Sequence, residues 1–196
     1  MSHSICILGG GFGGLYTALA LSKLDWKDEQ PDIVLVDQRD RFLFAPFLYE
    51  IVTGELHTWE IAPPFEELLA NTGVRFHLSG VASIDMNAQT VALTDGATLS
   101  YDRIVLALGG EPPMDMAPGV AEHAIPFRSL EDAYRLKEKL RSLEDSNPEK
   151  IRVAVVGGGY SGVEIACKVA ERLGDKGRVR IVERAPEILQ SSPDFN

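Results

Sequence analysis

The sequence predicts an α/β fold with two parallel βαβ units and a short β-meander between them. Two glycine turns predict it first, residues 9–14 near the start of the chain and residues 157–162 near its end. Each turn follows a short apolar run and opens a stretch of helical periodicity rich in Ala, Leu and Val. A carboxylate, Asp37 or Glu183, ends the apolar run that follows each turn. Between the two units, several short runs alternate as strands do.

Both turns match the pattern G-x-G-x-x-G in the context of a preceding strand and a following helix. Glycine is needed there because the turn is tight, because a pyrophosphate approaches the backbone closely, and because the helix packs against its strand. The pyrophosphate then lies at the helix N-terminus, and an acid about 20 residues further on binds a ribose hydroxyl. A single match also fits a glycine-rich turn without a ligand. Two complete matches predict two Rossmann-like dinucleotide sites.

The first βαβ unit is predicted from Ile5 to Asp37, with a helix after Gly14 that is apolar almost all round and therefore buried. Residues 42–54 are dense in aromatic side chains, and Pro46 argues against a central strand. This segment fits a core connection, and it also fits the lining of a flat apolar pocket. A short helix is expected over residues 65–71, after two prolines.

A β-meander is predicted over about residues 74–101. Its expected strands are Val74–His77, Val81–Asp85, Thr90–Leu93 and Thr98–Tyr101, with Asp95-Gly96 as a hairpin turn between the last two. An apolar strand over residues 102–108 then leads to Gly109-Gly110, as expected where a chain re-enters a parallel sheet and passes a ligand. Taken alone, these two glycines fit a simple turn.

A proline-punctuated linker over residues 111–118 precedes a helix that we expect to begin at a capping box, Ser129 to Asp132, and to end near Leu143. The second βαβ unit follows, with strands expected over residues 151–156 and 179–182. Glu183 ends the second of these strands.

Composition and charge exclude several classes of function. The net charge of −10 and the scattered Lys and Arg argue against nucleic-acid binding. Cys6 and Cys167 form no Cys-x-x-Cys pair, and the four histidines have no ligand spacing, so we expect neither dithiol chemistry nor a metal site. No apolar run is long enough to span a membrane, and no leader precedes the first strand, which favours a cytoplasmic protein.

The order of these elements resembles the two-dinucleotide-binding flavoproteins, and within them the type II NADH dehydrogenases, which are non-proton-pumping NAD(P)H:quinone oxidoreductases. The residues that carry the resemblance are both glycine turns, residues 44–54, 101–109, 118–120, 123–127 and 129–133, and the continuation of the second turn to Glu164. Residues 155–166 and 186–194 are most similar to the cyanobacterial and plastid branch that reduces prenylquinones, including demethylphylloquinone.

The resemblance implies an FAD-binding domain over residues 1–118, a linker with a connecting helix over residues 119–148, and an incomplete NAD(P)H-binding domain over residues 149–196. The FAD site would comprise Gly9, Gly11, Phe12, Gly13, Gly14, Asp37, Gln38, Arg39, Pro46, Ala107 and Gly109. The NADH site would comprise Gly157, Gly159, Tyr160, Ser161, Gly162, Glu183 and Arg184. Leu108 departs from the Ala-Thr-Gly that is frequent there, so no hydroxyl contact is carried over.

The resemblance also implies a reaction in which a hydride passes from NADH to the flavin and two electrons pass to a quinone. Glu164 matches a catalytic glutamate near the nicotinamide, although a carboxylate at that position also suits the positive end of a helix dipole. Glu183 favours NADH, whereas the adjacent Arg184 leaves room for NADPH. The alternatives are a reductase of ferredoxin or another protein, a non-catalytic nucleotide-binding protein, and an inactive fragment.

Length is the main departure from the family, because the family continues for about as long again. We therefore expect an N-terminal part of a longer protein whose C-terminal segment would bind the inner face of a membrane. The resemblance also allows a homodimer.

Overall fold

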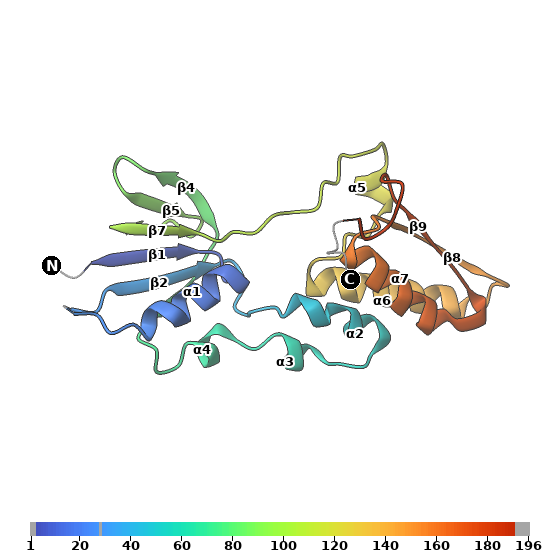
Figure 1. Cartoon of the computed structure of the whole chain (residues 1–196), viewed down its shortest axis with the longest axis horizontal. Helices are drawn as coiled ribbons and strands as arrows, with labels where there is room; N and C mark the ends of the chain where they lie inside the picture. The colour runs from blue at the N-terminus through green and yellow to red at the C-terminus, as the bar shows by residue number, and fades with distance from the viewer. Residues whose placement is uncertain (1–2, 28, 191–196) are drawn as a thin grey trace. The chain divides into compact units, whose positions relative to one another are not determined.

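The computed structural model describes residues 3–27 and 29–190, which form two compact units (Figure 1). The first unit consists of the residues up to Leu43 together with Ala62–Pro112. The second consists of Phe44–Ile61 together with the residues from Pro113 onward. The aromatic segment 44–61 thus belongs to the same compact unit as the second glycine turn. No helix in the described ranges is long and apolar enough to cross a membrane.

A four-stranded parallel sheet forms the centre of the first unit, in the order β3-β2-β1-β7. Its strands are β1 Ser4–Leu8, β2 Asp32–Asp37, β3 Arg75–Leu78 and β7 Arg103–Leu106. The two central strands are almost continuously apolar because a parallel sheet buries both of its faces. Helix α1, Phe12–Ser22, packs against β1 and β2 and connects them as predicted.

An antiparallel meander packs on the sheet through alternate residues of β1 and β2. It consists of β4 Val81–Asp85, β5 Thr90–Leu93 and β6 Thr98–Ser100. The core between meander and sheet comprises Cys6, Leu8, Val34, Val36, Val91, Leu93 and Tyr101. The meander is therefore shorter than predicted: the run near residues 74–77 pairs with β2 in parallel instead. Strand-like alternation defines a half-buried strand but not its partner, so the sequence could not distinguish these two fates.

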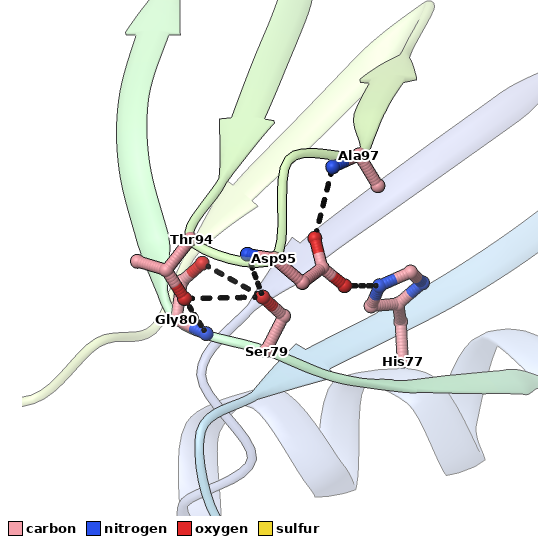
Figure 2. A network of polar contacts seen from close by, with 6 residues as sticks. All are labelled: His77, Ser79, Gly80, Thr94, Asp95 and Ala97. Carbon is pink, nitrogen blue, oxygen red and sulfur yellow. Dashed lines mark hydrogen bonds and ion pairs between the residues drawn. The ribbon is translucent and has the colours of Figure 1, made fainter.

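A network of polar contacts joins the end of β3 to the hairpin turn between β5 and β6 (Figure 2). His77 Nε2 lies 2.7 Å from Asp95 Oδ2, and Asp95 Oδ1 accepts a hydrogen bond from the Ala97 amide at 2.9 Å. The hydroxyl of buried Ser79 accepts the Asp95 amide at 3.3 Å and lies 3.2 Å from the Thr94 hydroxyl. The network therefore links the turn between β5 and β6 to the end of β3.

The second unit contains two parallel strands and the helices around them. Its elements are the 3-10 turn η1 Ala45–Phe47, α2 Leu48–Thr53, α3 Thr58–Ile61, α5 Val120–His123, α6 Leu130–Asp145, β8 Ile151–Val156, α7 Tyr160–Leu173, the 3-10 turn η2 Gly174–Lys176 and β9 Gly177–Val182. The predicted capping box of α6 is confirmed, since Ser129 and Asp132 each accept the other's backbone amide. Helix α4, Phe65–Leu68 in the first unit, is shorter than the predicted residues 65–71.

Candidate functional site

The first glycine turn lies between the end of β1 and the start of α1. Gly9 has φ of +100°, and its amide donates to the Val36 carbonyl at 2.8 Å. A Cβ at Gly9 would lie 2.3 Å from the Ala107 carbonyl oxygen, and a Cβ at Gly14 would lie 1.7 Å from the Gly9 carbonyl oxygen. Only glycine fits at these two positions, because the obstructing atoms are backbone atoms.

Gly11 differs from its neighbours because a Cβ there would meet no protein atom within 4 Å. Its φ of −69° and ψ of −167° are open to any residue, and no side chain caps the helix that begins at Phe12. The requirement for glycine at this position therefore has no steric cause within the described part of the chain. Open space in front of a helix N-terminus suits the close approach of an anionic group, as the motif predicts.

Asp37, the last residue of β2, is 8% exposed and turns its carboxylate toward the glycine turn. Oδ2 accepts the Gly10 amide at 2.6 Å, and Oδ1 accepts the Arg39 amide at 2.8 Å. The Arg39 guanidinium Nε lies 3.5 Å from Oδ1, and Gln38 is exposed. A carboxylate has about four acceptor sites, so Asp37 keeps acceptor capacity for a ribose hydroxyl.

The second glycine turn repeats this geometry position by position. Gly157 has φ of +110° and donates to the Val182 carbonyl at 2.8 Å. A Cβ at Gly162 would lie 1.9 Å from the Gly157 carbonyl oxygen, whereas a Cβ at Gly159 would meet nothing within 4 Å. Glu183 accepts the Gly158 amide through Oε2 and, through Oε1, the amide two residues further on at 2.8 Å. The same local sequence thus builds the same site twice.

A pocket of about 480 Å³ lies on the second turn. Its lining residues are Gly158, Gly159, Glu183, Ala185, Glu187, Leu189 and Gln190. Hydrogen bonds from the Ala185 and Gly158 amides lower the pKa of Glu183, so this carboxylate is anionic at neutral pH. Leu189, with φ of +57°, closes the pocket through its amide, which donates to the Gly158 carbonyl at 2.7 Å. Arg184 is exposed.

The other predicted residues fall on both units. In the first unit, Ala107 lies under the glycine turn, with its Cβ 3.4 Å and 3.6 Å from the positions that a Cβ on Gly14 and Gly13 would take, and Gly109 follows with φ of +74°. In the second unit, Pro46 lies in η1, and Tyr160, Ser161 and Glu164 lie in the first turns of α7. The roles assigned to all of these residues remain predictions.

Sequence reasoning missed Tyr49, which is 6% exposed on α2 of the second unit. Burial raises the pKa of Tyr49, the Glu164 and Glu50 carboxylates raise it further, and a hydrogen bond with Ser161 opposes them. Tyr49 is therefore a neutral hydroxyl beside two predicted site residues. No local motif identifies it, since the contact depends on how segment 44–61 packs. Sequence reasoning also missed that Asp37 and Glu183 each accept a hydrogen bond from the amide of the second glycine in their turn. Both the glycine and the acid belong to the repeated motif.

The cysteines differ in environment. Cys6 lies in β1 of the first unit, where burial raises the pKa of its thiol to about 11, and Cys167 is exposed on α7 of the second. The Cys6 thiol is therefore protonated and poorly nucleophilic. Among the described residues, no group of three or more His, Cys, Asp or Glu side chains could hold a metal ion.

Comparison with known proteins identifies relatives over nearly the whole chain. The demethylphylloquinone reductase of Synechocystis sp. is 60% identical over 197 residues, covering 98% of this chain and 49% of that protein. The alternative NAD(P)H-ubiquinone oxidoreductase C1 of Arabidopsis thaliana is 49% identical over 209 residues, covering 98% of this chain and 40% of that protein. The structure of NDH2 from Plasmodium falciparum in complex with NADH has the same fold, with a TM-score of 0.85 at 22% identity, over 99% of this chain and 44% of that one.

These matches confirm the α/β fold and the resemblance to type II NADH dehydrogenases that the sequence predicted. The chain spans half or less of the length of these two curated relatives. The family description "Pyridine nucleotide-disulphide oxidoreductase" matches residues 3–195. The two glycine turns share one geometry, and in each turn a carboxylate accepts the amide of the second glycine. The chain belongs to the pyridine nucleotide-disulphide oxidoreductase family.

Proposed function

We propose that this protein is an FAD-dependent NAD(P)H:quinone oxidoreductase, or the part of one that binds its two dinucleotides. One observation carries the proposal: two glycine turns of the same geometry stand in a chain that is 60% identical to a demethylphylloquinone reductase. A reaction between a nicotinamide donor and a quinone acceptor needs two dinucleotides in one protein when a flavin mediates it.

The first site suits FAD. Its open space at Gly11 and the start of α1 would receive the pyrophosphate, and Asp37 would accept hydrogen bonds from a ribose hydroxyl. Gln38 and Arg39 would lie at the edge of the adenosine, while Ala107 and Gly109 would lie nearer the flavin. When bound, FAD supplies the redox chemistry that no amino-acid side chain provides, by accepting a hydride and releasing electrons to an acceptor.

The second site suits NADH. The pocket at Gly158 and Gly159 would hold its phosphates, and Glu183 would bind the adenosine ribose. An anionic carboxylate repels a 2′-phosphate, whereas the exposed Arg184 attracts one, so the balance between these two residues decides between NADH and NADPH. Glu164 would stand two residues beyond Gly162 on α7, as the acid that positions the nicotinamide or aids proton delivery.

The overall reaction would convert NADH to NAD⁺ by loss of a hydride and convert a quinone to a quinol by gain of two electrons and two protons. One proton derives from that hydride and the other from solvent. A membrane quinone as acceptor, attachment to the inner face of a membrane and a homodimer belong to this proposal by resemblance to the family.

An anaerobic titration of the purified full-length protein tests the proposal. The protein should carry a yellow flavin, NADH should bleach it, and a soluble quinone should restore the colour. A flavin that NADH does not bleach would overturn the proposal. Restoration of the colour by a ferredoxin but not by a quinone would assign the protein to the reductases of protein acceptors instead.

A further inference from the structure

The segment that follows β3 lies beside Asp37, at the edge of the parallel sheet where the first glycine turn begins. Leu78, the last residue of β3, pairs with Asp37, and the next amide, that of Ser79, donates to the Asp37 carbonyl at 2.9 Å. Ligands of open α/β sheets bind outside the carboxyl ends of the strands. Residues 79–80 therefore flank the part of the first site to which the motif assigns a ribose.

Ser79 is buried at this edge, with 7% of its surface exposed. Its hydroxyl lies 3.2 Å from the Thr94 hydroxyl and accepts the Asp95 amide at 3.3 Å (Figure 2). A buried hydroxyl costs free energy unless it is hydrogen-bonded, and here the partners come from the hairpin turn between β5 and β6. The Ser79 side chain therefore connects the segment after β3 to that hairpin.

Thr94 makes the matching contacts from the hairpin. Its hydroxyl accepts the Gly80 amide at 3.0 Å, and its own amide donates to the Gly80 carbonyl at 2.9 Å. A Cβ on Gly80 would lie 3.1 Å from both Cγ2 and Oγ1 of Thr94, so the two residues are in close contact. One residue of the hairpin thus binds both main-chain polar groups of Gly80.

Asp37 is held from two directions. Its carboxylate accepts the amides of Gly10 at 2.6 Å and Arg39 at 2.8 Å, and its main-chain carbonyl accepts the amide of Ser79. The first two bonds fix the carboxylate relative to the glycine turn, whereas the third fixes the backbone that carries it. A hydrogen bond to a ligand weakens steeply when its acceptor is misaligned, so binding depends on both.

We infer that Ser79 and Thr94 are positioning residues for Asp37: they brace the segment after β3 against the β5–β6 hairpin, and this brace keeps the Asp37 carboxylate where it accepts a ribose hydroxyl in the first site. Neither side chain needs to contact the ligand, because the Ser79 amide transmits the constraint to the Asp37 backbone. The inference rests on the proposed function, which assigns the first site to FAD.

Titration of the flavin-free, full-length protein with two ligands tests this assignment. The ligands are FAD and the analogue that carries 2′-deoxyadenosine in place of adenosine, and the change in flavin fluorescence gives each dissociation constant. Thr94→Val removes the hydroxyl and keeps the branched shape, Thr94→Ser keeps the hydroxyl, and Ser79→Ala removes its partner. Thr98→Val is the matched control, because Thr98 is an exposed threonine on β6 of the same hairpin.

The wild type should bind FAD about tenfold more tightly than the analogue, the difference expected for one hydrogen bond to a charged acceptor. Thr94→Val and Ser79→Ala should weaken FAD binding about fivefold and analogue binding less than twofold, because a displaced acceptor matters only to the ligand that has the hydroxyl. Thr94→Ser and Thr98→Val should bind both ligands as the wild type does.

Equal weakening toward both ligands in Thr94→Val and Ser79→Ala would overturn the inference, because a general loss of structure does not distinguish the ligands. Unchanged affinities in these two variants would overturn it too, as would the same selective loss in Thr94→Ser or Thr98→Val. A wild type with equal affinity for FAD and the analogue would remove the ribose contact and the inference with it. Anaerobic addition of NADH to the FAD-loaded wild type tests the proposed function separately: a flavin that is not bleached overturns that function, while a selective loss of FAD affinity in the variants still supports the brace.

Discussion

Asp37 Oδ2 accepts the backbone amide of Gly10 at 2.6 Å, in a contact that is buried between the end of β2 and the first glycine turn. Glu183 and Gly158 make the equivalent contact in the second unit. The acid that the motif assigns to a ribose therefore has a second task, which needs no ligand. It fixes the middle of the glycine turn to the neighbouring strand, so that the outer face of the turn is shaped before a dinucleotide arrives.

Asp37→Asn should lose bound flavin, because it removes the charge from both acceptor oxygens and replaces one of them with an NH2 group that cannot accept the amide of Gly10 or Arg39. A hydrogen bond to a buried charged group is worth about 2 kcal/mol, so the variant should also unfold at a lower temperature. Asp32→Asn is the control: Asp32 begins the same strand but forms an exposed pair with Arg75. Equal flavin content per chain in both variants would contradict the role of Asp37.

Glu183→Gln should increase the affinity for NADPH relative to NADH, because it removes the negative charge that repels a 2′-phosphate. Since the Ala185 and Gly158 amides lower the pKa of Glu183, the wild type should still discriminate at pH 4.5, the usual pKa of this carboxyl, where an unshifted group would be half protonated. The ratio of the two dissociation constants measures the effect. Glu171→Gln, on an exposed part of α7, should leave it unchanged, and an unchanged ratio in Glu183→Gln would remove Glu183 from the ribose site.

The contact of His77 with Asp95 in Figure 2 should make part of the stability depend on pH. The hydrogen bond with His77 lowers the pKa of Asp95, helped by the Ala97 amide. A carboxyl whose pKa is lowered by folding contributes stability above its usual pKa of about 4 and loses it as the pH falls through the lowered value. Asp95→Asn should therefore melt below the wild type at pH 6, and the two curves should converge in acid. A constant difference between them would contradict this origin, and Asp115→Asn, in the exposed linker, serves as control.

Arg172→Ala should destabilise the second unit by about 2 kcal/mol, since it leaves a half-buried carboxylate and a backbone carbonyl without their donor. Arg172 is 16% exposed and donates to both carboxylate oxygens of Glu144, at 3.0 Å and 2.8 Å, as well as to Val52. Arg141→Ala removes a fully solvated pair with Asp145 and should cost less than about 0.5 kcal/mol. Denaturant unfolding measures the free energy of unfolding of both variants. Equal decreases would show that the contacts of Arg172 stabilise the unit no more than an exposed ion pair does.

Local rules made much of the fold predictable. Gly9 and Gly157 need positive φ, and Gly14 and Gly162 need the absence of a Cβ, so these requirements are written into the sequence at fixed spacing. The Asp95-Gly96 hairpin was predictable for the same reason, with Gly96 at φ of +90°. Where a position satisfies a constraint from its immediate neighbours, the sequence alone identifies it.

Positions defined by distant partners were not predictable. Arg75–Leu78 has the alternation of a meander strand, and only its pairing with β2 makes it part of the parallel sheet. Tyr49 is one of several aromatic residues in its segment, and only the packing of α2 on α7 distinguishes it. The parts of the candidate site that depend on packing between segments far apart in the chain therefore needed the structure.

The central claim is that the two equivalent turns are separate sites for two different dinucleotides, and Gly11→Ala and Gly159→Ala test it most directly. A Cβ at either position meets no protein atom within 4 Å, so the ligand-free forms of both variants should melt like the ligand-free wild type. In the full-length protein, Gly11→Ala should lose flavin and still bind NADH, whereas Gly159→Ala should keep its flavin and bind NADH at least about tenfold more weakly, because the methyl group occupies the space of a phosphate. Loss of both ligands in either variant, or of neither in both, would contradict the claim.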